Sequence, residues 1–122
     1  MSTTILCNKT IVLGVSGGIA AYKAAELLRL LQKQGADVRV MMTRNAEWFI
    51  GAMTFEALSG HPVCTSLFER GSEASIKHID LADKADAVVI APATANIIAK
   101  LANGIADDAL STFLLAVTKP II

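Results

Sequence analysis

The sequence has no excess of charge of either sign. Lys and Arg total 11, Asp and Glu total 11, and the formal net charge at pH 7 is +0. Because binding to nucleic acid or to an anionic membrane depends on a basic surface, this balance argues against both partners. We therefore expect neither nucleic acid nor a membrane among the partners of this chain.

Cysteine and histidine are scarce as well, with two of each. Cys7 and Cys64 lack metal-ligand spacing, and no histidine cluster accompanies them, so no metal site is expected. The sequence leaves a disulfide between the two cysteines open, but a reduced cytosolic pair is the preferred interpretation.

Long apolar runs are missing too. None reaches the ~20 residues that cross a bilayer, and the N-terminus does not have the pattern of a signal peptide. We therefore expect a cytoplasmic protein. What the chain does have is apolar content, since 53% of its residues are hydrophobic and the mean hydropathy is +0.52. In 122 residues this fits one domain with a sheet buried on both faces, an oligomer interface, or both.

Short β-branched runs alternate with stretches of helical period. Strands are predicted over 10–15, 36–42 and 87–91, the last with the apolar sequence of an inner strand. Helices are predicted over 19–34, ending near Gly35, and over 44–50, 55–58, 80–84, 94 or 95 to 103, and 107–117. Residues 119–122 begin a further strand. This order predicts an α/β three-layer sandwich with a parallel, flavodoxin- or Rossmann-like sheet, in one domain over residues 1–122.

A Ser-Gly-Gly turn joins the first predicted strand to the first predicted helix. Ser16 offers a hydroxyl, Gly17 and Gly18 let a ligand approach the backbone, and the start of the helix favours an anion. Open α/β sheets bind ligands at this edge. The turn matches neither the dinucleotide fingerprint nor the Walker loop. Taken alone, it is equally well interpreted as an ordinary tight turn.

Small polar residues follow the other two predicted strands at the same edge of the sheet. Thr43 ends the second strand, and Thr94 to Asn96 follow the third. Asn96 suits hydrogen bonding to a flavin, although it also suits a helix-entry residue that caps its own backbone. Three strand ends that present such groups together predict a ligand site.

Four segments, taken in order, match motifs of one enzyme family. They are 11–23, Met42-Thr43, His-Ile-Asp-Leu at 78–81, and Ala-Pro-Ala-Thr-Ala-Asn at 91–96, and residues 103–112 also look like the family. They resemble the phosphopantothenoylcysteine decarboxylases, which belong to the flavin-containing cysteine decarboxylases. In bacteria such a domain usually forms the N-terminal part of a bifunctional coenzyme A biosynthesis flavoprotein. Thr94 replaces a serine of the family motif P-A-S-A-N-T, and Ile97 replaces its final threonine.

The resemblance implies FMN as the cofactor. The cofactor-binding residues that it implies, together with the serine of the turn, are Ser16, Gly17, Gly18, Ile19, Thr43, Thr94, Ala95 and Asn96. Of these, Thr43 would lie near the phosphate, and the last three would line the flavin.

His78 matches the histidine that this family uses in catalysis, and it is the candidate catalytic residue. The implied enzyme is a carboxy-lyase. Its flavin oxidises 4′-phosphopantothenoylcysteine to a thioaldehyde, CO2 leaves, and the reduced flavin then yields 4′-phosphopantetheine. His78 would act as acid or base, since histidine titrates near neutral pH. Without the motif, a lone histidine would more simply be a solvated loop residue.

The family pattern continues past the motifs found here. Its P-x-M-N-x-x-M-[WY] motif, with an asparagine that helps hold the substrate carboxylate, has no counterpart before Ile122, nor does its flap with a reductive cysteine. We therefore expect a fragment or truncated product that binds flavin incompletely and does not finish the reaction alone. The resemblance also implies a homo-oligomer built from trimers, and phosphopantothenoylcysteine synthetase as a fused or cooperating partner.

Three alternatives share the fold. A peptidyl-cysteine decarboxylase of lantibiotic maturation would use the same chemistry, and a flavin prenyltransferase would not need the His78 motif. A non-catalytic flavin-binding or regulatory relative would carry an acidic tail, and this chain has none. A flavodoxin-type electron carrier is disfavoured, because its phosphate loop is richer in Ser and Thr.

Overall fold

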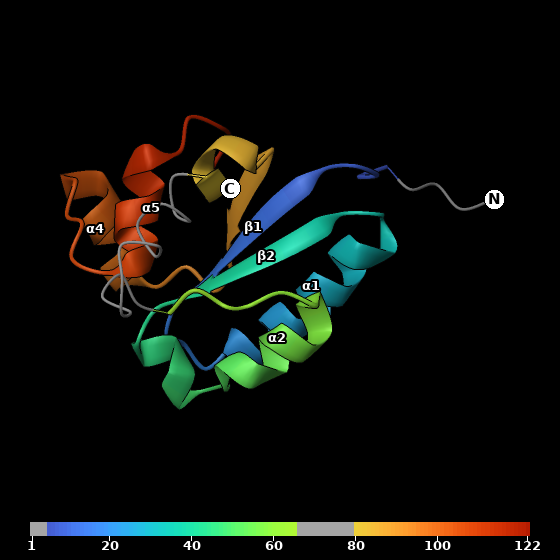
Figure 1. Ribbon diagram of the computed structural model, residues 1–122. Coiled ribbons are helices and arrows are strands. Elements are labelled where there is room, and N and C mark those ends of the chain that lie inside the picture. The colour runs from blue at the N-terminus through green and yellow to red at the C-terminus, as the bar shows by residue number, and fades with distance from the viewer. Residues whose placement is uncertain (1–4, 66–79) are drawn as a thin grey trace.

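A parallel sheet organises the chain. The computed structural model describes residues 5–65 and 80–122, and within them three strands lie in the order β2-β1-β3 (Figure 1). β1 spans Thr10–Val15, β2 spans Asp37–Met42 and β3 spans Ala87–Ile90, all parallel. The three predicted strands are therefore confirmed to within one residue at each end.

Two further segments extend the sheet at its outer sides. Cys64 pairs with Met41 beside β2, and Ile121 pairs with Val88 of β3, both in parallel. The Ile122 N–H donates to the Val88 carbonyl at 2.7 Å. β3 thus has a neighbour on each side, which suits its apolar sequence. The predicted strand start at 119–122 is confirmed as this pairing with β3.

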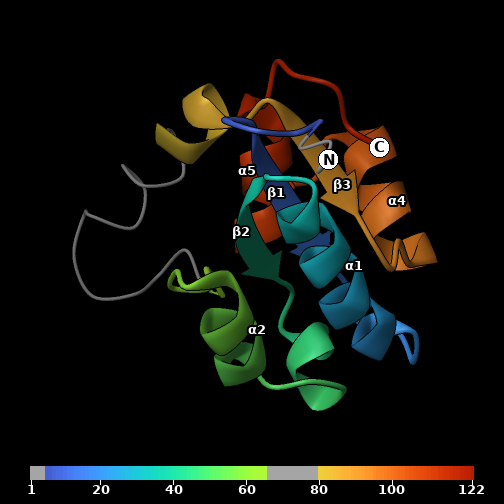
Figure 2. The same ribbon diagram turned by 90° about the vertical axis from the view of Figure 1, so that its right-hand side faces the viewer.

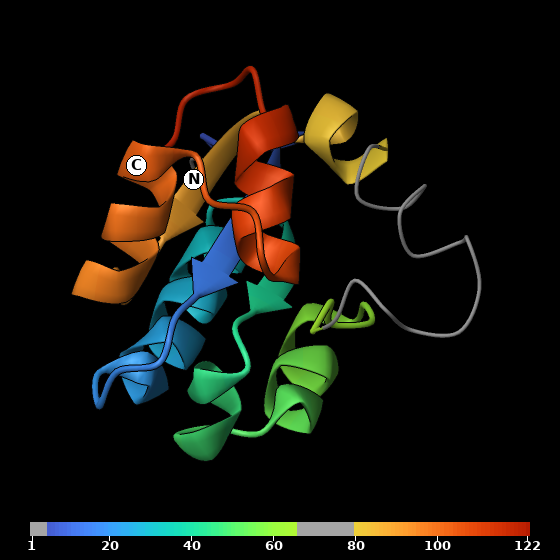
Figure 3. The same ribbon diagram turned by 90° about the vertical axis from the view of Figure 1, so that its left-hand side faces the viewer.

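Helices cover both faces of the sheet. α1 (Ala21–Lys33) and α2 (Ala52–Ser59) lie on one face, with α1 in front of the sheet in Figure 2. α4 (Ala95–Asn103) and α5 (Ala109–Ala116) lie on the other, and α5 stands in front of the sheet in Figure 3. Residues 80–84 are also helical, as predicted. This arrangement is the three-layer sandwich expected from the order of elements.

The alternation of side chains along β1 divides the core in two. Leu13 and Val15 belong to the buried cluster beneath α1 and α2, whereas Val12 belongs to the cluster beneath α4 and α5. Successive side chains of a strand point to opposite faces, so one central strand supplies both cores. At Gly14, an added Cβ would lie 2.9 Å from a Leu110 methyl, which shows how closely α5 approaches β1.

The helix ends follow the sequence signals closely. Gly35 (φ 94°) follows the C-cap of α1 and Gly104 (φ 66°) is the C-cap of α4, both with positive φ. Asp108 caps α5, as its position in the predicted helix suggested. α1 begins two residues later than predicted, and α2 is longer at both ends than the predicted 55–58.

The helix predicted over 44–50 is present but shorter, and it is of the 3-10 type: η1 spans Asn45–Trp48. The Ala46 N–H donates to both the carbonyl (3.1 Å) and the hydroxyl (3.2 Å) of Thr43, three residues earlier. This i to i−3 pattern tightens the backbone beyond α-helical geometry.

No helix in the described part of the chain is long and apolar enough to cross a membrane. Within residues 5–65 and 80–122, no group of three or more His, Cys, Asp or Glu is placed to hold a metal ion. Cys7 is an exposed thiol, and no disulfide joins it to Cys64.

Candidate functional site

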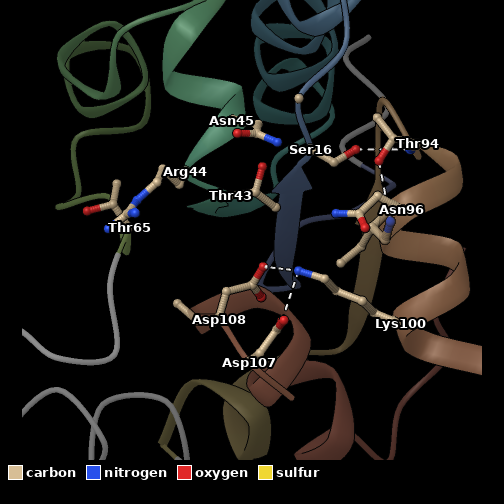
Figure 4. A pocket seen from close by; sticks show the side chains of 13 residues that line it. Ser16, Thr43, Arg44, Asn45, Thr65, Thr94, Asn96, Lys100, Asp107 and Asp108 are labelled. Atoms are coloured by element: carbon tan, nitrogen blue, oxygen red, sulfur yellow. Dashed lines mark hydrogen bonds and ion pairs between the residues drawn. The ribbon is translucent and has the colours of Figure 1, made fainter. Parts of the chain in front are cut away.

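A cavity of about 410 Å³ opens at the carboxyl ends of the strands (Figure 4). Its volume lies in the range of ~300–1,000 Å³ that small-molecule sites commonly enclose. The turns after β1, β2 and β3 form one side, and α4 with the start of α5 forms the other. The lining residues are Ser16, Gly17, Thr43, Arg44, Asn45, Thr65, Thr94, Asn96, Ile97, Lys100, Asp107, Asp108 and Ala109.

Ser16 joins two of these turns. Its hydroxyl donates to the Pro92 carbonyl and accepts a hydrogen bond from the Thr94 N–H at 3.0 Å. The Ser16 N–H also donates to Pro92. The residue is 1% exposed. Its hydroxyl therefore fixes the turn after β1 to the turn after β3. These bonds set the relative position of the two turns that line the cavity.

The two glycines of the turn differ in what surrounds them. A Cβ on Gly17 would lie 2.5 Å from the Asn45 Cβ and 2.8 Å from the Asn45 carbonyl carbon, closer than atoms pack. A Cβ on Gly18 would meet Pro92 and Thr94 at 3.6 Å, an ordinary contact. Gly17 is thus required by the approach of η1, a reason that the sequence pattern did not supply.

The two threonines also hold the backbone around the cavity. The Thr43 N–H donates to the Val15 carbonyl at 3.0 Å, and its hydroxyl accepts from Ala46. The Thr94 hydroxyl accepts from the Ile97 N–H at 3.4 Å and caps α4. Thr94, and not Asn96, therefore makes the helix-entry bond.

Asn96 and Lys100 stand one turn apart on α4 and extend toward the cavity (Figure 4). Residues at this spacing share a helix face. The Lys100 ammonium lies 2.9 Å from Asp107 Oδ1 and 3.1 Å from Asp108 Oδ2. Its hydrogen bond to Asp107, supported by Asp108, raises the pKa of Lys100 above its usual value. The cavity wall therefore carries a fixed positive charge between two carboxylates.

Asp108 links this cluster to the start of α5. Its Oδ1 accepts from the Ser111 N–H at 2.7 Å, and the Asp108 N–H donates to the Ser111 hydroxyl at 3.1 Å. Burial raises the pKa of Asp108, but the bonds from Ser111 and Lys100 outweigh it and hold the pKa below its usual value. Asp108 is thus ionised at neutral pH.

The structure brings five of the predicted cofactor residues to the cavity: Ser16, Gly17, Thr43, Thr94 and Asn96. Gly18, Ile19 and Ala95 do not line it, and the Ile19 side chain is 82% exposed. For these three, contact with the ligand stays a prediction. His78 lies outside the described residues, so its catalytic role also stays a prediction.

Sequence reasoning missed the far wall of the cavity. Asn45, Thr65, Lys100, Asp107 and Asp108 all line it. The spacing of Lys100 from Asn96 on a predicted helix was the one signal that pointed to it. The acidic pair was interpreted only as a helix start, because the partner that turns it toward the cavity lies on another helix.

Comparison with known proteins gives a consistent result. The Flavoprotein family profile matches residues 2–122. The chain is 53% identical over 117 residues to the coenzyme A biosynthesis bifunctional protein CoaBC of Bacillus subtilis (strain 168), covering 96% of this chain and 29% of that protein. It is 53% identical over 116 residues to CoaBC of Escherichia coli (strain K12), covering 95% and 29%. The chain thus spans under a third of the length of these relatives.

Solved structures share the fold. The FMN-dependent cysteine decarboxylase SpaF superposes with a TM-score of 0.85 at 34% identity, covering 95% of this chain and 67% of that one. A PPC decarboxylase variant complexed with pantothenoylaminoethenethiol gives a TM-score of 0.73 at 28% identity, covering 93% and 64%. The predicted flavodoxin-like α/β fold and the family resemblance are therefore confirmed. The chain belongs to the flavoprotein family.

Proposed function

We propose that this chain binds FMN in the cavity at the strand ends and is the decarboxylase part of a coenzyme A biosynthesis protein. Its reaction is the conversion of 4′-phosphopantothenoylcysteine to 4′-phosphopantetheine. One observation carries the proposal: the cavity lies at the edge where open α/β sheets bind ligands, and 96% of this chain aligns with CoaBC at 53% identity.

The residues that line the cavity fit a flavin nucleotide. Hydroxyl and amide groups converge there from three strand ends, and Arg44 adds a positive charge beside Thr43. Within the described part of the chain, the side chains of Arg44 and Asn96 make no hydrogen bond, so both are open to a ligand. FMN would supply the two-electron oxidation at the substrate thiol carbon that makes loss of CO2 feasible.

The chain itself would orient the cofactor and move a proton. Ser16, Thr43 and Thr94 fix the turns that carry the open donors, so the site is organised before a ligand arrives. His78, by its motif, would take or give the proton at the substrate thiol.

Two further properties belong to this proposal. Copies of the chain would associate, since Ile19, Trp48 and Met53 are large apolar side chains that are 82%, 83% and 79% exposed. The catalytic unit would work with phosphopantothenoylcysteine synthetase, as the bifunctional name of the relatives suggests.

The test is FMN titration and CO2 release with the complete protein that contains this chain. Wild type should bind FMN and release CO2 from 4′-phosphopantothenoylcysteine. His78→Asn should keep FMN bound and stop CO2 release, while His61→Asn serves as the histidine control. His61 pairs with Asp37 at the opposite edge of the sheet and should be dispensable for turnover.

Normal turnover by His78→Asn would remove the catalytic assignment, and absence of FMN binding in wild type would remove the proposal. The likeness to SpaF favours a second candidate, a peptidyl-cysteine decarboxylase. CO2 release from a peptide with a C-terminal cysteine, but not from 4′-phosphopantothenoylcysteine, would select it.

A further inference from the structure

The cluster formed by Lys100, Asp107 and Asp108 is built into the wall of the cavity. All three residues line it, and the lysine side chain is 17% exposed. The ammonium is held by two carboxylates at 2.9 and 3.1 Å, so its position does not depend on a ligand. Figure 4 shows the cluster facing the turns after β1 and β2 across the cavity.

This cluster does more than the fold requires. Asp108 already caps α5 through Ser111, and an uncharged Asn would cap as well. Burying a lysine stem and its charge between helices carries a desolvation cost. Since the charge lies against the cavity, its effect falls on whatever is bound there.

We propose that Lys100, balanced by Asp107 and Asp108, is a positioning residue that sets the redox balance of the flavin bound in this cavity. The inference rests on the proposed function. Reduction of a flavin by two electrons with uptake of one proton leaves the ring one unit more negative. A positive charge near the ring favours that reduced form, and a negative charge disfavours it.

The cluster therefore makes predictions of opposite sign for its members. Lys100→Met should lower the reduction potential, because it leaves two carboxylates unbalanced. Asp108→Asn should raise the potential, because it removes one carboxylate and keeps the helix cap. A purely structural role would not separate the two variants by sign. Lys100→Arg keeps the charge and should restore the wild-type potential.

The expected size is about tenfold in the ratio of affinities for reduced and oxidised flavin, which is about 30 mV for a two-electron couple. The measurement is an anaerobic titration of the FMN-loaded complete protein with xanthine and xanthine oxidase beside a reference dye. Lys33→Met is the matched control, since Lys33 is exposed in the last turn of α1, at the opposite edge of the sheet.

Each outcome decides the matter. Shifts of opposite sign for Lys100→Met and Asp108→Asn, absent in Lys33→Met, support the inference. If Lys100→Met does not retain flavin, a raised potential in Asp108→Asn with a wild-type value in Lys100→Arg supports it equally. Unchanged potentials with FMN bound overturn it and leave the proposed function standing.

Riboflavin, which lacks the phosphate of FMN, distinguishes an effect of Lys100 on the phosphate from an effect on the flavin ring. If Lys100→Met weakens FMN but leaves the affinity for riboflavin and the potential unchanged, the lysine acts on the phosphate and the inference is wrong. Absence of flavin from the wild-type protein overturns the proposed function, and the inference with it.

Discussion

Gly17 gives the sharpest test of how the site is built. The residue does not have positive φ, which Gly35, Gly60 and Gly104 do have. A glycine is needed at position 17 because Asn45 approaches it, and a Cβ there would lie 2.5 Å from the Asn45 Cβ and 2.8 Å from a backbone carbon. Gly17→Ala must therefore displace η1, whose first residue, Asn45, lines the cavity. Overpacking of this kind costs about 1–3 kcal/mol.

Gly18→Ala is the matched control in the same turn. Its Cβ would meet Pro92 and Thr94 at 3.6 Å, which is ordinary contact. Replacing glycine by alanine at a compatible backbone stabilises by about 0.4–1 kcal/mol through the unfolded chain. Gly18→Ala should thus be neutral or slightly stabilising when the protein is unfolded without FMN.

Thermal unfolding with and without FMN measures both effects. For a domain of this size, 1 kcal/mol corresponds to about 4 °C in Tm. Gly17→Ala should lower the Tm by about 4–12 °C and weaken FMN binding, because Asn45 and Arg44 move away from the cavity. Equal Tm values for the two variants would refute the argument from close packing. A Gly17→Ala variant that is destabilised but binds FMN normally would show that the position of η1 does not affect FMN binding.

Two further changes test the bonds that hold the cavity together. Ser16→Ala removes the buried hydroxyl that donates to the Pro92 carbonyl and accepts from the Thr94 N–H, and it should cost about 1–3 kcal/mol in urea unfolding. Ser59→Ala, outside the cavity, should cost less. Asp108→Ala removes a helix cap and should cost about 1 kcal/mol at neutral pH. Because the folded pKa of Asp108 is lowered, its stabilisation is present above the usual carboxyl pKa of about 4 and is lost as pH falls through the folded value. The cost of Asp108→Ala should therefore shrink in acid, and a cost independent of pH would contradict the ion pair.

Local signals explain what the sequence predicted well. The strand over 10–15 is β-branched and ends at glycine, and Asp108 precedes an apolar helical run, so each element carries its own boundary. The convergence of Thr43 and Thr94 followed from topology alone, since parallel strands end at one edge. These predictions needed no knowledge of which side chains touch.

The remaining features arise from contacts between distant segments. Ser16 bonds to Thr94, 78 residues away, and Gly17 packs on Asn45 from another turn. The helix predicted over 44–50 became a 3-10 turn because the Thr43 hydroxyl captures an N–H three residues on. Neither propensity nor period specifies such bonds. The sequence therefore identified the residues at the three strand ends, but it showed neither how they are held nor which residues form the far wall of the cavity.

That distinction changes the roles of the hydroxyls in the site. Ser16, Thr43 and Thr94 were expected to face the cofactor, yet all three hydroxyls bond to backbone groups of the protein. Ser16 bonds to the turn after β3, whereas Thr43 and Thr94 each accept from the N–H three residues further along the chain. A group that already has donors and acceptors within the protein contributes less to a new ligand than an open one. The side chains with no hydrogen bond within the described residues are the Asn96 amide and the Arg44 guanidinium. Recognition of the ligand should therefore depend on these two side chains, and the hydroxyls should matter through the shape of the turns that they fix.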